Sequence, residues 1–215
     1  MVKEMIKIVI ADDHPFIREG IKKVVSGEMD LEVIGDAEDG NELLSILKEK
    51  TPNILVLDIT MPGKSGLELL KQLNNLYPKL PVLVLSIHSA ERFAIRALKA
   101  GAYGYLTKTS ISDELIKAIR KIVTEKRKYI TPEVAEQLAS QVDTSKEGAL
   151  HEDLSDREFE VLCMIASGMD VNDIAEELSL SPQTIHTYRT RIKEKMNISS
   201  NVEMTRYAIE NDLIE

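Results

Sequence analysis

The chain has 215 residues, 43% of them hydrophobic and 29% charged, a composition that predicts a globular protein of one large or two small domains. No apolar run approaches the roughly 18 residues of a membrane helix, and the charges among residues 1–7 argue against a signal peptide. The one cysteine, Cys163, excludes an internal disulfide framework, and we interpret it as a small buried apolar residue. These features predict a cytoplasmic protein with no membrane partner.

The net charge of −9 is spread unevenly along the chain. Residues 150–215 contain 14 acidic and 6 basic side chains, a balance of −8, whereas residues 1–149 contain 22 and 21, a balance of −1. A nucleic-acid partner for the C-terminal part would therefore need a local basic surface, because phosphates respond mainly to charges within about 10 Å.

Residues 5–126 alternate short apolar runs with segments of helical periodicity. Two of the runs, Ile54–Leu57 and Val82–Leu85, are apolar at every position, which is typical of parallel strands buried on both faces. The alternation predicts an α/β domain over residues 1–127 with a doubly wound, five-stranded parallel sheet. The expected strands are Ile6–Ala11, Leu31–Ala37, Ile54–Leu57, Val82–Leu85 and Ala102–Leu106, and the expected helices are 15–26, 40–50, 65–76, 89–100 and 111–126.

The rest of the chain shows mainly helical periodicity. We predict a linker at residues 128–149, with a short helix at 132–142 and a polar, aperiodic stretch at 143–149. Residues 150–215 then predict a small all-α domain of four helices. The first begins with a capping box at Ser155 and Glu158, the second spans about 170–178, the third opens at Ser181-Pro182, and the fourth spans about 200–211.

Polar side chains follow four of the expected strands. Asp12 and Asp13 follow the first, Asp58 the third, Ser86 the fourth and Lys108 the fifth. Because the carboxyl ends of parallel strands share one edge of a sheet, we expect these side chains to converge there. Converging carboxylates repel one another unless a cation is present, and Mg²⁺ is the natural oxygen-seeking candidate.

This arrangement suits phosphoryl transfer. With the metal bound, Asp58 can act as a nucleophile, while Lys108 neutralises charge on the transferring group and Ser86 donates a hydrogen bond to it. The alternative for Asp12 and Asp13 is that they cap a helix or lie at a solvated strand end. A pure metal-binding or hydrolase site also remains open, although no Ser–His–Asp arrangement supports hydrolysis.

Three motifs resemble the receiver domain of two-component response regulators over about residues 5–126. They are Ala11-Asp12-Asp13-His14-Pro15, the run 58–66 (DITMPGKSG) and Gly104-Tyr105-Leu106-Thr107-Lys108. The resemblance implies a flavodoxin-like fold and Mg²⁺ binding by Asp12, Asp13, Asp58 and the backbone carbonyl of Thr60. It further implies that a sensor histidine kinase phosphorylates Asp58, that Ser86 and Tyr105 form a switch pair, and that the domain catalyses nothing beyond its own phosphorylation and dephosphorylation.

Two positions near Ser86 have separate interpretations. We interpret His88 as an exposed loop residue. A branched Ile87 beside the switch hydroxyl would shield an acyl phosphate from water, which predicts slow self-dephosphorylation. For Tyr105, a ring that covers the sheet edge is a structural alternative to the switch role.

The C-terminal part resembles the LuxR-type DNA-binding domain, the output module of NarL/FixJ regulators, over about residues 150–213. The segments that carry this resemblance are 154–162 (LSDREFEVL), 174–178 (IAEEL), 181–185 (SPQTI) and 192–196 (IKEKM). It implies that the third helix enters the major groove of double-stranded DNA. The predicted DNA-binding residues are Thr184, His186, Thr187, Arg189, Thr190, Arg191, Lys193 and Lys195.

The third helix could supply the local basic surface that an acidic domain needs in order to bind DNA. Between His186 and Lys195 it carries four cations against the single acid Glu194. The alternative is that these cations lie on a solvated helix face. The sequence departs from the family at His186, Tyr188 and Thr190, positions that often carry lysine, histidine and a basic residue, so we expect weak monomer binding and reliance on dimers.

The fourth helix offers apolar side chains that serve either a homodimer formed on activation or the domain's own core: Val202, Tyr207, Ala208 and Ile209. As a whole, the sequence predicts a phosphorylation-switched transcription factor. The alternatives are an interaction protein whose acidic helical domain docks on other proteins, and an atypical regulator that works without phosphoryl transfer.

Overall fold

The computed structural model describes residues 5–61, 66–86, 91–132, 134–136, 138, 149–211 and 213–214. The chain divides into two compact units, residues 1–135 and 136–215, and the division falls within the stretch predicted as a linker. Of the predicted helix at 132–142, positions 132, 134–136 and 138 are helical and the others lie outside the described residues. No helix among the described residues is both long and apolar enough to cross a membrane.

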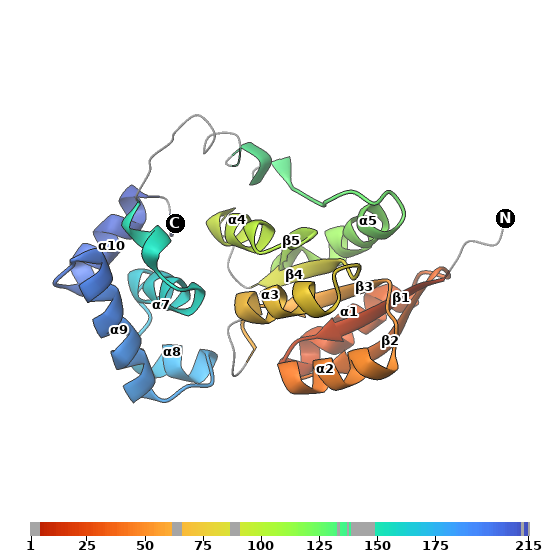
Figure 1. Ribbon diagram of the computed structural model, residues 1–215, viewed down its shortest axis with the longest axis horizontal. Coiled ribbons are helices and arrows are strands. Elements are labelled where there is room, and N and C mark those ends of the chain that lie inside the picture. Colours follow the sequence, from red (N-terminus) through yellow and green to blue (C-terminus); the bar gives the residue numbers. More distant parts are fainter. Residues whose placement is uncertain are drawn as a thin grey trace. The chain divides into compact units, whose positions relative to one another are not determined.

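The first unit is the predicted doubly wound α/β domain (Figure 1). Its five parallel strands have the order β2-β1-β3-β4-β5, so the chain reverses direction across the sheet between β1 and β3. Such a reversal leaves a crevice at the carboxyl ends of the strands, where ligands bind in this architecture. The strands are β1 (Ile6–Ala11), β2 (Leu31–Ala37), β3 (Ile54–Asp58), β4 (Val82–Ser86) and β5 (Gly104–Thr107).

Helices cover both faces of this sheet. Helix α1 (Pro15–Ser26) and α5 (Ile111–Val123) pack on one face, where Ile21 and Ile119 join a core with alternate residues of the strands. The opposite face is covered by α2 (Gly40–Glu49), α3 (Gly66–Leu76) and α4 (Glu91–Lys99) (Figure 1). β3 and β4 are buried at every position, as their unbroken apolar runs predict.

Two boundaries differ from the prediction for local reasons. β5 begins at Gly104 instead of Ala102 because the amide of Ala102 donates to the carbonyl of Ala97 and so caps α4, with Gly101 at φ +102°. Helix α5 ends at Val123, short of the predicted 126, and Lys126 nearby adopts a left-handed φ of 57°.

The second unit consists of the four predicted helices after a short 3-10 turn, η2 (Leu150–Asp153). They are α7 (Asp156–Ala166), α8 (Val171–Glu177), α9 (Pro182–Met196) and α10 (Asn201–Glu210). Each start is capped by a side-chain oxygen, and the predicted Ser155–Glu158 capping box is formed in full. The buried side of α9 consists of Ile185, Ile192 and Met196, and several residues on its opposite side are exposed.

Candidate functional site

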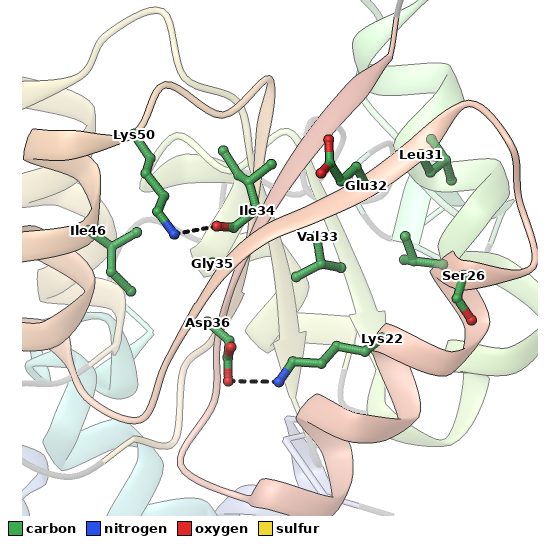
Figure 2. A pocket seen from close by; sticks show the side chains of 11 residues that line it. Lys22, Ser26, Leu31, Glu32, Val33, Ile34, Gly35, Asp36, Ile46 and Lys50 are labelled. Atoms are coloured by element: carbon green, nitrogen blue, oxygen red, sulfur yellow. Dashed lines mark hydrogen bonds and ion pairs between the residues drawn. The ribbon is translucent and has the colours of Figure 1, made fainter.

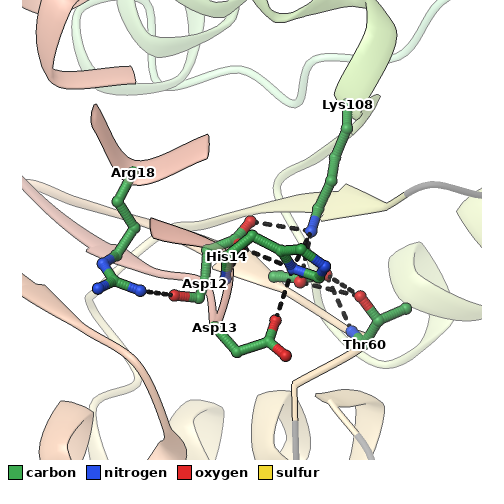
Figure 3. Close-up of polar contacts among 7 residues, drawn as sticks. Asp12, Asp13, His14, Arg18, Thr60 and Lys108 are labelled. Carbon is green, nitrogen blue, oxygen red and sulfur yellow. Dashed lines mark hydrogen bonds and ion pairs between the residues drawn. The ribbon is translucent and has the colours of Figure 1, made fainter. Parts of the chain in front are cut away.

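Three carboxylates converge at the carboxyl edge of the sheet (Figure 3). Asp12 follows β1, Asp58 ends β3, and both are fully buried, while the side chain of Asp13 is 20% exposed. Together with His14, each residue offers one ligand atom, and these four atoms lie within 4.8 Å of one another. The predicted convergence of Asp12, Asp13 and Asp58 is therefore present.

Asp58 is surrounded by hydrogen-bond donors. The backbone amide of Thr60 donates to Asp58 Oδ1 at 2.9 Å, and Lys108 Nζ donates to Oδ2 at 2.7 Å. The Thr60 hydroxyl lies 2.7 Å from Oδ1 and 2.9 Å from Oδ2, and it donates its one proton to either oxygen in turn. These donors fix the orientation of the Asp58 carboxylate within the edge of the sheet.

Lys108 supplies the positive charge of the cluster. Its side chain is 7% exposed, and Nζ lies 3.0 Å from Asp12 Oδ2 as well as 2.7 Å from Asp58 Oδ2. Burial by itself lowers the pKa of Lys108, but the two carboxylates outweigh burial and raise that pKa above its ordinary value. The lysine is therefore held as an ammonium ion between the two acids.

One ammonium does not satisfy all of the acidic groups. Burial raises the pKa of Asp12, the charge of Asp58 raises it further, and Lys108 offsets these effects only in part. Asp13 Oδ1 is buried and accepts no hydrogen bond from the described part of the chain, and Asp12 Oδ2 has only the ammonium of Lys108, which it shares with Asp58. Carboxylate oxygens left this way are the ligands that a hard divalent cation takes, so the residues fit Mg²⁺.

Ser86 and Tyr105 lie beside this cluster. Ser86 ends β4 and is fully buried, and Tyr105 in β5 is 6% exposed. The two side chains are hydrogen bonded to each other, and burial raises the pKa of the Tyr105 phenol well above its ordinary value. Tyr105 therefore both packs inside the domain and contacts the hydroxyl next to Asp58. Ile87 and His88 lie outside the described residues.

Arg18 is a contact of the site that the sequence did not reveal. Its Nη1 donates to the backbone carbonyl of Asp12 at 2.7 Å, and its Nε donates to Asp36 Oδ2 at 3.2 Å. Lys22 lies 3.1 Å from the same Asp36 oxygen (Figure 2). The signal in the sequence is a cation one turn into the helix that follows the acidic pair, but its target, a main-chain carbonyl, leaves no trace in the sequence.

The hollow drawn in Figure 2 is separate from the acidic site. It lies along β2 between α1 and α2, and its lining includes Lys22, Asp36 and Lys50. Lys22 pairs with Asp36, and Lys50 Nζ donates to the carbonyl of Ile34. These three charged groups are thus used within the domain, and we place the chemistry at the carboxyl edge.

Helix α9 does not present its four cations on one face. Lys195 Nζ donates to Glu158 Oε2 at 2.7 Å and to the carbonyl of Asp153 at 3.3 Å, and Lys193 Nζ donates to the carbonyl of Ser199 at 2.7 Å. Arg189 is half-buried, and its buried Nε has no hydrogen-bond partner within the described part of the chain.

Arg191 is the exposed cation of α9 for which the described residues offer no hydrogen bond or ion pair. His186, Thr187 and Thr190 are exposed on the same helix, whereas Thr184 is half-buried and meets the capping hydroxyl of Ser181. Of the eight predicted DNA-binding residues, four are therefore freely exposed and four have other surroundings within the unit.

The fourth helix of the unit packs against the core on one side, and its dimer role stays a prediction. Ala208 is buried, and the Tyr207 hydroxyl lies 2.9 Å from His151 Nδ1. Val202 and Ile209 are 77% and 56% exposed. Core packing therefore uses one side of α10, and two apolar side chains remain on its surface.

Comparison with known proteins identifies both units. The response regulator receiver domain family matches residues 8–120, and the luxR family of bacterial regulatory proteins matches residues 152–208. Response regulator GacA of Pseudomonas aeruginosa is 35% identical, over 98% of this chain and 99% of its own. Response regulator UvrY of Escherichia coli K12 is 33% identical, over 97% and 96%. RcsB of Salmonella enterica serovar Typhimurium, solved bound to the rprA promoter with the phosphomimetic BeF₃⁻, is 25% identical with a TM-score of 0.63, over 95% and 98%.

The parallel sheet and its acidic edge thus define a receiver domain, and the four helices define an output domain of the helix-turn-helix class. The chain belongs to the response regulators of the NarL/FixJ class, which join a receiver domain to a LuxR-type output domain. This is a family of transcription regulators and not of classical enzymes.

Proposed function

We propose that Asp58 accepts a phosphoryl group from a sensor histidine kinase. The observation that carries the proposal is the contact of one buried carboxylate with Thr60 and Lys108 at the carboxyl edge of the sheet. A carboxylate oxygen of Asp58 attacks the phosphorus of a phosphohistidine, so that a P–O bond forms as the P–N bond breaks. The imidazole leaves with the bonding electron pair and takes a proton from solvent.

Asp12, Asp13, Asp58 and the backbone carbonyl of Thr60 would hold Mg²⁺ in this site. The bound cation would neutralise charge on the transferring phosphoryl oxygens. Lys108 is held within 2.7 Å of Asp58 Oδ2, so its ammonium is available to the same oxygens once the acyl phosphate forms.

Ser86 and Tyr105 would read the phosphorylation state. Ser86 ends β4, which pairs with the strand that carries Asp58, and its hydroxyl is hydrogen bonded to Tyr105 in the present structure. When the acyl phosphate forms, the Ser86 hydroxyl turns to a phosphoryl oxygen and Tyr105 changes its contacts.

We assign the receiver domain to residues 1–127, the linker to residues 128–149 and the output domain to residues 150–215.

The output domain would bind double-stranded DNA through α9. RcsB, a relative in fold and sequence, is solved in complex with DNA, and in one structure two RcsB dimers bind two parallel DNAs. The exposed side of α9 offers His186, Thr187, Thr190 and Arg191 to the major groove. Exposed Val202 and Ile209 on α10 support a homodimer, which we assign to the activated state.

A gel-shift experiment with duplex DNA tests this function. We expect the wild-type chain to bind more tightly after incubation with acetyl phosphate and Mg²⁺, and the Asp58→Asn variant to show no such gain. DNA binding that never depends on acetyl phosphate would favour a regulator that works without phosphoryl transfer. No DNA binding in either state would favour the alternative, a protein-interaction module whose acidic helical domain has a net charge of −8 over residues 150–215.

A further inference from the structure

His14 lies against the acidic site without serving the helix that it begins. It occupies the N-cap position of α1, yet its side chain makes no capping hydrogen bond. Its Nδ1 lies 2.8 Å from Asp13 Oδ1, 3.3 Å from Asp12 Oδ1 and 3.4 Å from Lys108 Nζ (Figure 3). The imidazole therefore faces the same space as the carboxylates.

The backbone holds His14 in this place from both sides. Its amide donates to Asp12 Oδ1 at 2.8 Å, and its carbonyl accepts the first hydrogen bonds of α1 from Ile17 and Arg18. Pro15 follows it and fixes the first turn of the helix. With the backbone fixed, only the side-chain torsions of His14 remain to be ordered when the ring takes up a ligand.

The contact of His14 with Asp13 is short and leaves the imidazole nitrogen facing the carboxylate. Asp13 Oδ1 is buried and accepts no hydrogen bond from the described residues, although His14 Nδ1 is only 2.8 Å away. Asp12 Oδ2, on a side chain that is fully buried, is turned into the cluster, where Lys108 Nζ lies 3.0 Å away. Carboxylate oxygens and an imidazole nitrogen thus lie close enough together to bind one cation.

We infer that His14 Nδ1 is a ligand of the cation in this site, and that it makes the site prefer first-row transition metals to Mg²⁺. Carboxylates and water suit Mg²⁺, whereas imidazole suits metals such as Co²⁺ and Zn²⁺. A set of three carboxylates and one imidazole therefore gains more affinity for Co²⁺ than for Mg²⁺. The inference rests on the proposed metal site, to which it adds a fourth side chain and a metal preference.

The test compares the binding of Mg²⁺ and of Co²⁺ to the full chain by isothermal titration calorimetry. We expect His14→Ala to weaken Co²⁺ binding by about tenfold or more, a loss like that from removing a metal's supporting contacts, and to change Mg²⁺ affinity by less than about threefold. The matched control is Phe16→Ala, which truncates a neighbouring side chain that is 90% exposed and should leave both affinities unchanged.

A spectroscopic readout separates ligation from a general effect on the fold. When Co²⁺ is bound, the ring protons of a ligating imidazole show strongly shifted NMR resonances, and we expect one such set, absent in His14→Ala. Equal Co²⁺ affinity in wild type and His14→Ala, or shifted resonances that survive the substitution, would overturn the inference while leaving the Mg²⁺ site intact. If the wild-type chain binds neither cation, the proposed metal site itself fails.

Discussion

Lys195 and Arg191 are both cations of α9, yet the structure predicts opposite consequences when each is replaced. Lys195 Nζ is bonded to Glu158 Oε2 at 2.7 Å and to the carbonyl of Asp153, whereas Arg191 is exposed without such a contact. Lys195→Gln should therefore lower the stability of the output domain and leave DNA binding largely intact. Arg191→Gln should weaken DNA binding and leave the stability of the output domain largely unchanged.

The expected loss of stability in Lys195→Gln follows from burial, and the expected change in salt dependence in Arg191→Gln follows from counterion release. Glu158 is 4% exposed and would lose a charged hydrogen bond but keep the amide of Ser155, while Lys195 is 42% exposed, so screening reduces the loss to about 1 kcal/mol. For a unit of this size that loss lowers the midpoint of thermal unfolding by roughly 4–8 °C. A lost phosphate contact at Arg191 lowers the magnitude of the slope of log K against log salt by about 0.9.

Two measurements on the phosphorylated full chain check this prediction: fluorescence anisotropy with duplex DNA over a series of salt concentrations, and thermal unfolding by circular dichroism. The reasoning is refuted if Lys195→Gln reduces the salt slope as much as Arg191→Gln does. It is also refuted if Lys195→Gln leaves the unfolding midpoint unchanged, because the ion pair with Glu158 would then contribute nothing.

Three further substitutions probe the receiver. Burial and Asp58 raise the pKa of Asp12 above its unfolded value, so in the metal-free protein this group holds its proton more tightly in the folded than in the unfolded chain, and its contribution to stability is lost as pH rises through the window above the ordinary Asp pKa. Asp12→Asn should therefore raise the unfolding midpoint at pH 7 without Mg²⁺, by a gain of the order of 1 kcal/mol, and flatten the pH dependence in thermal scans. Arg18→Met removes the donor to the Asp12 carbonyl and should weaken Mg²⁺ binding about tenfold in calorimetry with little loss of stability. Gly66→Ala places a Cβ in steric overlap with the backbone of Ile59 and should cost about 3 kcal/mol or more in urea unfolding.

The sequence predicts the fold well because its periodic patterns are unambiguous. Unbroken apolar runs identify β3 and β4, and the capping residues Ser155 and Ser181 identify the starts of α7 and α9. What it leaves out are the residues on which a helix or strand ends. The amide of Ala102 caps α4, and a main-chain bond of this kind depends on geometry and not on the side chain.

The sequence likewise predicts some residues of the acidic site and misses others. Strand topology alone brings Asp12, Asp58 and Lys108 together, so the order of the motifs is enough to predict them. His14 and Arg18 escape prediction because their roles depend on side-chain direction and on a backbone acceptor. On α9 the count of cations was a poor guide, since intradomain partners take up Lys193 and Lys195.

The most direct test of the central claim is the site of phosphorylation. The full chain is incubated with acetyl phosphate and Mg²⁺, the acyl phosphate is trapped by borohydride reduction, and the modified residue is located by mass spectrometry. We predict the modification at Asp58 alone, dependent on Mg²⁺ and absent from Asp58→Asn. Modification at another residue, or an Asp58→Asn variant that is still labelled to the wild-type extent, would contradict the account.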